Sequence, residues 1–367
     1  MVCKWNYDAR ADGSGLGWDR NFLSGVGFTP SELPPSVVGE KVRPPGEPVA
    51  GGLGATAAAD FGLEAGTPLA VGMIDAHAGG IGCLGANLPG ESAQPPLTAR
   101  MALIAGTSTC HMASSASPTF VGGVWGPYYG AMLPGLFLNE GGQSAAGALI
   151  DHVIESHAAA AELRREAEAA GVPPSIHLNQ LLEQMAKAEG AESVAALAAE
   201  LHVTPDFIGN RSPLADPAMR GSVIGLGMSA SIHDLARLYL ATVQALAYQT
   251  RQIVEALGYT DPPISAVVAC GGLAKNELYV STHADVLGLP IYTPVQEEAV
   301  LLGAAILGAA AGGAHASVEQ AMGRMSAIGG TVRPNDALSD YHSRKYAVFR
   351  MMSEDQRAYR RVMLEGS

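Results

Sequence analysis

Four short segments of the sequence carry residues suited to bind or activate a ligand, and each follows a stretch with the pattern of a β-strand. The segments are Asp75-Ala-His77, Gly106-Thr107-Ser108, Glu140-Gly-Gly-Gln143 and Gly271-Gly272-Leu-Ala-Lys-Asn276. Open α/β sheets bind their ligands beyond the carboxyl ends of the strands. These four segments are therefore the candidate ligand-binding positions of the chain.

The first two segments have the residue types that phosphoryl chemistry uses. Asp75 leaves an apolar run, 68–74, that is typical of a buried strand, and a carboxylate there could act as general base on a substrate hydroxyl. A turn-forming Asp is the alternative. The 106–108 turn offers backbone N–H groups and two hydroxyls, which favours a phosphate cradle. Taken alone, it also fits a plain hairpin turn.

The other two segments are suited to contact flat or hydroxylated ligands. The Gly271-Gly272 pair lets a flat ligand approach the backbone, and Asn276 could bond a base edge or cap the following helix. Glu140 and Gln143 are polar residues in a stretch expected to be buried. Such side chains need partners, either the hydroxyls of a ligand or the protein's own backbone.

Other motifs are weaker. Residues 80–85 match the pattern G-x-G-x-x-G, but no acid follows about 20 residues on to contact a ribose, so a dinucleotide site is not predicted. There is no P-loop and no G-x-S-x-G elbow. His152 and His157 are five residues apart, off a common helical face. We therefore predict no protein metal site there.

Apolar strands alternate with helices along most of the chain, which predicts an α/β fold. The expected strands are 68–74, 101–105, 109–113, 136–138, 264–270 and 291–293, and the expected helices include 56–63, 231–257, 276–287, 299–310 and 341–364. Residues 158–202 are helical, with a break at 171–174, and are interpreted as a peripheral insertion. Residues 1–55 are irregular and rich in Pro and Gly.

Composition excludes several classes of protein. The 367 residues contain 22 Lys and Arg against 35 Asp and Glu, a net charge of −13, which argues against nucleic acid or an anionic membrane as partner. The four scattered cysteines form no CxxC pair, as expected for reduced thiols in the cytoplasm. The longest uncharged apolar run, 299–314, is shorter than the ~20 residues of a membrane span.

Taken in order, six segments resemble the FGGY carbohydrate kinases and, within them, the ribulokinase-like branch. They are Cys3-Lys-Trp5, Ile74-Asp-Ala-His-Ala-Gly-Gly80, Val124-Trp-Gly-Pro-Tyr128, Leu138-Asn-Glu-Gly-Gly-Gln-Ser144, Gly209-Asn-Arg-Ser-Pro-Leu-Ala-Asp216 and Cys270-Gly-Gly-Leu-Ala-Lys-Asn276. The resemblance extends from residue 2 to residue 364. It implies an actin/Hsp70-like, ribonuclease H-like ATPase fold and the phosphorylation of D-ribulose or a related pentulose or polyol, with ATP and Mg²⁺ as cofactors.

The resemblance also implies a role for each candidate residue. Asp75 would be the general base. The turn of Gly106, Thr107 and Ser108 would hold phosphate, and Gly271, Gly272 and Asn276 would contact adenosine. On the sugar side, the resemblance implies Lys4 and Glu140 as a charged pair assisted by Gln143 and Arg211. The expected partners are the sugar and, as one assembly, a second copy in a homodimer.

The sequence departs from the family in one respect. Family members open with an Asp-x-Gly-Thr phosphate loop, and this sequence has none. We therefore expect residues 1–92 to be the trailing part of the N-terminal lobe, 93–335 to be the C-terminal lobe and 336–367 to be a closing helix. We also expect this chain alone to have little or no kinase activity. The alternative is a catalytically inert protein that binds nucleotide or sugar and acts through partners.

Overall fold

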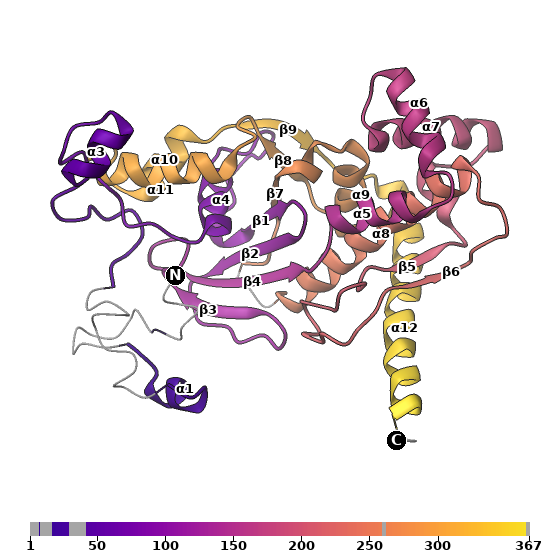
Figure 1. The fold of residues 1–367 in the computed structure, drawn as a ribbon, viewed down its shortest axis with the longest axis horizontal. Helices are drawn as coiled ribbons and strands as arrows, with labels where there is room; N and C mark the ends of the chain where they lie inside the picture. Colours follow the sequence, from indigo (N-terminus) through magenta and orange to yellow (C-terminus); the bar gives the residue numbers. More distant parts are fainter. Residues whose placement is uncertain (1–6, 8–16, 29–41, 259–261, 365–367) are drawn as a thin grey trace.

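The computed structural model describes residue 7 and residues 17–28, 42–258 and 262–364. A seven-stranded mixed sheet runs through this part of the chain, in the order β3-β4-β2-β1-β7-β8-β9 (Figure 1). Its strands are β1 (Arg100–Ala105), β2 (Thr109–Ser115), β3 (Trp125–Tyr129), β4 (Phe137–Gln143), β7 (Ala266–Cys270), β8 (Ile291–Pro294) and β9 (Ile328–Val332). The predicted α/β fold is confirmed.

Helices cover both faces of the sheet, because β1 and its neighbours are apolar on both sides. On one face α5 (Gly147–Ser156), α8 (Ile232–Ala256) and α9 (Glu277–Leu287) pack against Met101 and Leu103. On the other face α4 (Asp75–Leu84), α10 (Ala299–Ala311) and α11 (Val318–Met325) pack against Ala102 and Met112. The alternation of side chains along a strand separates the two sets of contacts.

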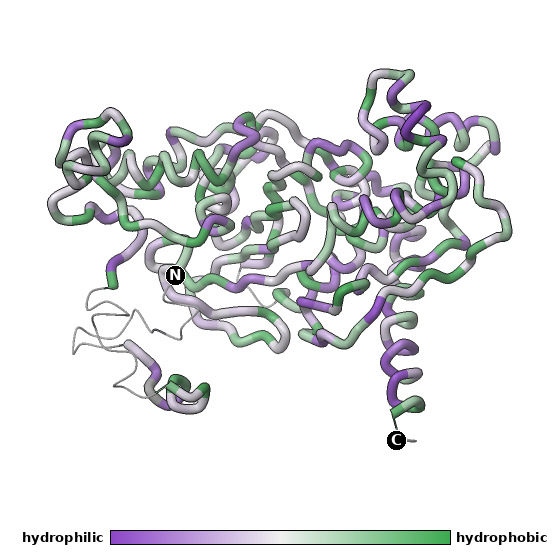
Figure 2. The backbone as a smooth tube through the Cα atoms, in the orientation of Figure 1, coloured by the Kyte–Doolittle hydropathy of each residue, from purple (hydrophilic) through white to green (hydrophobic). Residues whose placement is uncertain are grey.

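The remaining elements lie around this core. They are α1 (Arg20–Gly25), α3 (Ala55–Phe61), α6 (Ala160–Ala170), α7 (Pro174–Glu189), a two-stranded ribbon of β5 (His202–Thr204) and β6 (Ser222–Ile224), and α12 (Ser339–Leu364). Strongly hydrophilic residues line part of α6 and part of the protruding end of α12 (Figure 2). Among the described residues, none of the helices has both the length and the apolar character of a membrane span.

Local sequence signals place several of these elements where they were expected. Ser231 and Asp234 form a reciprocal capping box at the start of α8. The break between α6 and α7 is confirmed, with Gly171 ending α6 at φ 67°. Both helices also contribute to the core, since Leu163, Leu178 and Leu182 are fully buried in it.

The predicted strand at 68–74 is wrong. Within it, only Ala70 forms a β-bridge, to Pro48, and backbone hydrogen bonds join the segment to residues 46–49. Gly72 and Leu69 are exposed, so the run is not a buried sheet strand. An apolar run without a sheet neighbour stays an extended segment, and this one leads into α4.

Glycine allows α4 and α10 to cross in backbone contact. A Cβ on Gly82 would lie 2.0 Å from the carbonyl oxygen of Ala299, and a Cβ on Gly303 would lie 1.9 Å from that of Ala78. Any side chain at either position would push the helices apart. The crossing therefore fixes α4, and with it Asp75, against the rest of the fold.

Candidate functional site

Three strands end at one edge of the sheet, and the candidate segments lie there. β1 and β7 are parallel, with Ile104 paired to Cys270, so the 106–108 turn and Gly271 leave neighbouring strand ends. β4 runs in the same direction as β1, and its last residue, Gln143, pairs with Thr109. The glycine turns and the start of α5 therefore meet at the carboxyl edge of these strands, where an α/β sheet binds ligands.

Asp75 reaches the same edge from the opposite direction. α4 runs antiparallel to β1, since Arg100 at the start of β1 donates to the carbonyl of Leu84 at the end of α4, at 2.7 Å. One turn into α4, a Cβ on Gly79 would lie 3.3 Å from Cδ1 of Ile104, near the end of β1. Asp75 is the first residue of α4 and is exposed. Its carboxylate can therefore meet a ligand held over the strand ends.

The 106–108 turn is a hairpin turn anchored to α5. The amides of Ala146 and Gly147 donate to the carbonyls of Thr107 and Gly106, at 2.9 and 3.0 Å. Thr107 is exposed, and Gly106 and Ser108 are half-buried. The Gly106 amide donates to the Ser108 carbonyl at 3.0 Å, so all three carbonyls of the turn are occupied. A phosphate bound here would use the hydroxyls of Thr107 and Ser108 and the remaining backbone N–H groups.

The two glycines of the second glycine turn, Gly271 and Gly272, have different surroundings. Gly271 has φ 92°, and a Cβ there would lie 2.5 Å from the carbonyl oxygen of Ala105, so only glycine fits. Gly272 has no atom within 4 Å of such a Cβ, which leaves its surface open to a ligand. Asn276 is buried and caps α9, and its amide nitrogen donates to the hydroxyl of Tyr239 at 2.7 Å.

A charged cluster surrounds Glu140 on the α4 face of the sheet. Its carboxylate lies 3.0 Å from Nη2 of Arg211 and 3.2 Å from Nε2 of His77. Arg211 also stacks on Trp125, 4.4 Å above the ring, and Trp125 is paired with Glu140 across the strands. The side chains of His77 and Glu140 are almost fully buried, whereas that of Arg211 is 22% exposed. The cluster reaches the surface at Arg211 and at Trp125, which is 46% exposed.

Gln143 does not join this cluster, because it lies on the opposite face of the sheet. Its amide nitrogen donates to the backbone carbonyl of Leu246 in α8, at 2.7 Å, and it is fully buried. Lys4 lies outside the described residues. Sequence reasoning gave no role to His77, although it ends the candidate segment Asp75-Ala-His77, and none to Trp125, although it stands within a motif that resembles the family. The one signal in the sequence for His77 was its position two residues after Asp75.

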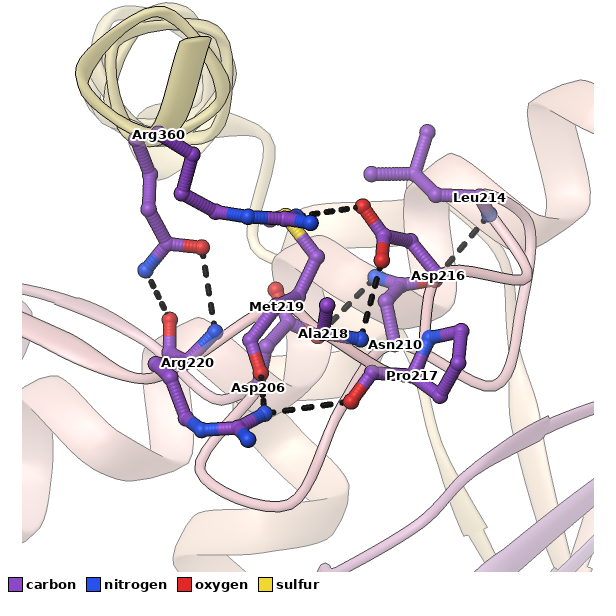
Figure 3. A network of polar contacts seen from close by, with 10 residues as sticks. Asp206, Asn210, Leu214, Asp216, Pro217, Ala218, Met219, Arg220 and Arg360 are labelled. Carbon is purple, nitrogen blue, oxygen red and sulfur yellow. Dashed lines mark hydrogen bonds and ion pairs between the residues drawn. The ribbon is translucent and has the colours of Figure 1, made fainter. Parts of the chain in front are cut away.

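The loop that carries Arg211 is built on a buried carboxylate. Asp206 accepts hydrogen bonds from Nδ2 of Asn210 at 2.9 Å and from Nε2 of Gln249 at 2.8 Å. Asn210 in turn accepts from the amide of Leu214, and its backbone pairs with Asp216 (Figure 3). The Asp216 carboxylate is held by Arg360 of α12 at 2.7 Å. These hydrogen bonds attach the loop to α12 and hold Arg211 in place beside Glu140.

Asp206→Asn is expected to change how stability depends on pH. Burial raises the pKa of Asp206 from 3.8 to about 6, so between these values the folded state binds more protons than the unfolded state. Wild-type stability therefore falls as pH rises through this window, by about 3 kcal/mol, and the variant lacks that loss. Urea unfolding of both proteins between pH 4 and 7 should show the gap growing in favour of Asp206→Asn.

Asp216→Asn is the matched control, with the opposite sign. Its hydrogen bond from Arg360 lowers the pKa of the Asp216 carboxyl, so its stabilisation is present at neutral pH and lost as pH falls. A constant gap between Asp206→Asn and wild type across the window would contradict the role given to burial of Asp206.

Comparison with known proteins identifies the family. The profile of the C-terminal domain of the FGGY family of carbohydrate kinases matches residues 101–312. An FGGY carbohydrate kinase domain-containing protein of Danio rerio is 49% identical over 361 residues, which are 97% of this chain and 65% of that protein. A D-ribulokinase of Saccharomyces cerevisiae is 38% identical over 84% of this chain and 46% of its own length.

A solved structure confirms the fold. A xylulose kinase from Rhodospirillum rubrum superposes with a TM-score of 0.70 at 22% identity, over 93% of this chain and 61% of that one. The chain spans about two thirds of the length of the Danio rerio relative. Since the matched profile covers more than half of the chain, this protein belongs to the FGGY family of carbohydrate kinases.

Proposed function

We propose that the chain takes part in the ATP-dependent phosphorylation of a small sugar, with D-ribulose or a related pentulose as acceptor. The observation that carries the proposal is the meeting of Asp75, the 106–108 turn and Gly272 at one edge of one sheet. Residues 93–335 would form the nucleotide-side lobe, in keeping with the profile match.

The chemistry follows from these positions. A neutral alcohol is a poor nucleophile, so a base must take its proton as it attacks. The Asp75 carboxylate accepts the proton of the sugar hydroxyl, the hydroxyl oxygen bonds to the γ-phosphorus of ATP, and ADP leaves. The 106–108 turn would hold the phosphates and Gly272 would lie against adenosine. Glu140 and Arg211 would orient the sugar, with Lys4 as a further candidate there, and Asn276 remains a candidate beside adenosine. Gln143 faces α8 on the opposite side of the sheet and is not proposed at the sugar.

Mg²⁺ would accompany ATP and neutralise part of its phosphate charge. Within the described part of the chain, no three His, Cys, Asp or Glu side chains gather as a metal site. In this proposal the residues of the chain supply positioning and proton transfer.

ADP release with D-ribulose and, separately, D-xylulose tests the proposal. It should be measured on the chain itself and on a chimaera that adds the portion of the Danio rerio relative outside the match. We expect release with D-ribulose in at least the chimaera, and calorimetry should detect ATP binding to the chain. Binding without turnover in either form would favour the inert binding protein, and neither binding nor turnover would reject a working site.

Gly272→Val is expected to weaken ATP binding about 10-fold, with little change in stability. A side chain at residue 272 meets open space within the protein but would occupy the surface proposed for adenosine. Calorimetry with ATP and urea unfolding measure the two effects. Gly271→Ala is the control. It is expected to lower stability, because its Cβ would lie 2.5 Å from the carbonyl oxygen of Ala105. Unchanged ATP affinity in Gly272→Val would remove Gly272 from the site.

A further inference from the structure

His77 stands at the centre of the Glu140 cluster with both of its ring nitrogens occupied. Nδ1 lies 3.1 Å from the carbonyl oxygen of Ala131, and Nε2 lies 3.2 Å from Oε2 of Glu140. The ring is 1% exposed, so water does not replace either partner. Its contacts therefore define where its protons must be.

Both partners of His77 are acceptors. A backbone carbonyl can only accept, so Nδ1 carries a proton. The Glu140 carboxylate also bonds Nη2 of Arg211 through its other oxygen, at 3.0 Å, and a guanidinium favours the ionised carboxylate. An ionised carboxylate only accepts, so Nε2 donates to it. The hydrogen bonding thus calls for an imidazolium at residue 77.

We propose that His77 is a positioning residue, a buried imidazolium that fixes the Glu140 carboxylate for sugar binding. This inference rests on the proposed sugar-side role of Glu140. His77 clamps the carboxylate from α4, and Arg211 clamps it from the 205–216 loop. The Glu140 carboxylate is thus held through both of its oxygens, by two segments far apart in the chain.

Because His77 lies in α4, it connects the Glu140 carboxylate to the helix that carries Asp75. Asp75 and His77 lie within one turn of the same helix, so α4 sets both the general base and, through Glu140, the sugar-binding carboxylate. A misplacement of about 1 Å between base and substrate can cost roughly 100-fold in rate. Linking both groups to one rigid helix holds their separation constant.

Nitrogen-15 spectra of the histidine-labelled chain test the proton assignment without any need for activity. Burial lowers the pKa of His111 to about 3 and those of His283 and His342 to about 4, so these rings are neutral references at pH 7. We expect both nitrogens of His77 at the protonated position, and Glu140→Gln to return Nε2 to the unprotonated one. An unprotonated His77 nitrogen in the wild-type chain overturns the proposal.

His77→Gln tests the positioning role, because it keeps a neutral donor but removes the charge. Calorimetry should show about 10-fold weaker binding of D-ribulose, with ATP affinity within twofold of wild type. His342→Gln makes the same substitution at another buried ring, one bonded to Tyr248, and should change neither affinity. Equal D-ribulose affinity in His77→Gln and wild type would also overturn the proposal. If wild type binds no D-ribulose, the proposed substrate is wrong, and the spectra still decide the state of His77.

Discussion

Gly303→Ala is expected to lower the free energy of unfolding by about 2–3 kcal/mol, although alanine is the better helix former. The three atoms nearest to the new Cβ would all be backbone atoms of Ala78, the closest at 1.9 Å, so no side-chain rotation can relieve the clash. α10 must then move off α4 and loosen the packing of Ile81 and Ile306, which lie in the same core cluster. Overpacking of this kind costs about 1–3 kcal/mol, and here it is forced on two helices.

The same substitution on the same helix supplies the control. Gly308 also lies inside α10, but a Cβ there meets nothing within 4 Å. Gly308→Ala should therefore raise stability by about 0.5–1 kcal/mol through helix propensity alone. Urea unfolding of both variants isolates the helix crossing from propensity. Equal effects of the two substitutions would show that the contact between α4 and α10 does not constrain the fold.

The central strands and the long helices could be predicted because their signals are local. The runs at 101–105 and 264–270 are continuous and apolar, and α8 has a capping box at its start. The edge strands β3 and β9 could not, since glycine and proline interrupt them and their strand state depends on pairing with a neighbour. Residues 68–74 have the composition of a strand but no sheet neighbour beyond residues 46–49.

The site was predictable in part, for a related reason. A glycine turn that follows an apolar strand can be recognised in the sequence, and the turns at 106–108 and 271–276 both lie at the expected edge of the sheet. The resemblance implied that Arg211 assists Glu140, but no local pattern indicates the cluster, because His77 and Arg211 are 63 and 71 residues away from Glu140 in the chain. The expected strand at 136–138 was also too short. With β4 extending to Gln143, alternation along the strand places Glu140 and Gln143 on opposite faces.

Asp75→Asn is expected to reduce sugar-dependent ADP release by roughly 10²–10⁴-fold, the range that a positioned general base contributes. Asparagine has the same size and keeps an oxygen to accept the amide of Ala76, the bond that Asp75 makes at 2.7 Å. The helix start and the two binding surfaces should therefore persist. Affinities for ATP and D-ribulose, measured by calorimetry, should stay within about threefold of wild type.

This combination of lost turnover and retained binding separates proton transfer from the other roles of an acid at a helix start. A carboxylate in the first turn also interacts favourably with the helix dipole, an effect of less than about 1 kcal/mol at an exposed position. Asp340→Asn removes a first-turn carboxylate from α12 and controls for that effect. Turnover is measured in the form of the protein that releases ADP as wild type. If Asp75→Asn turns over as fast as Asp340→Asn, the proton leaves the sugar by another route and Asp75 is not the base.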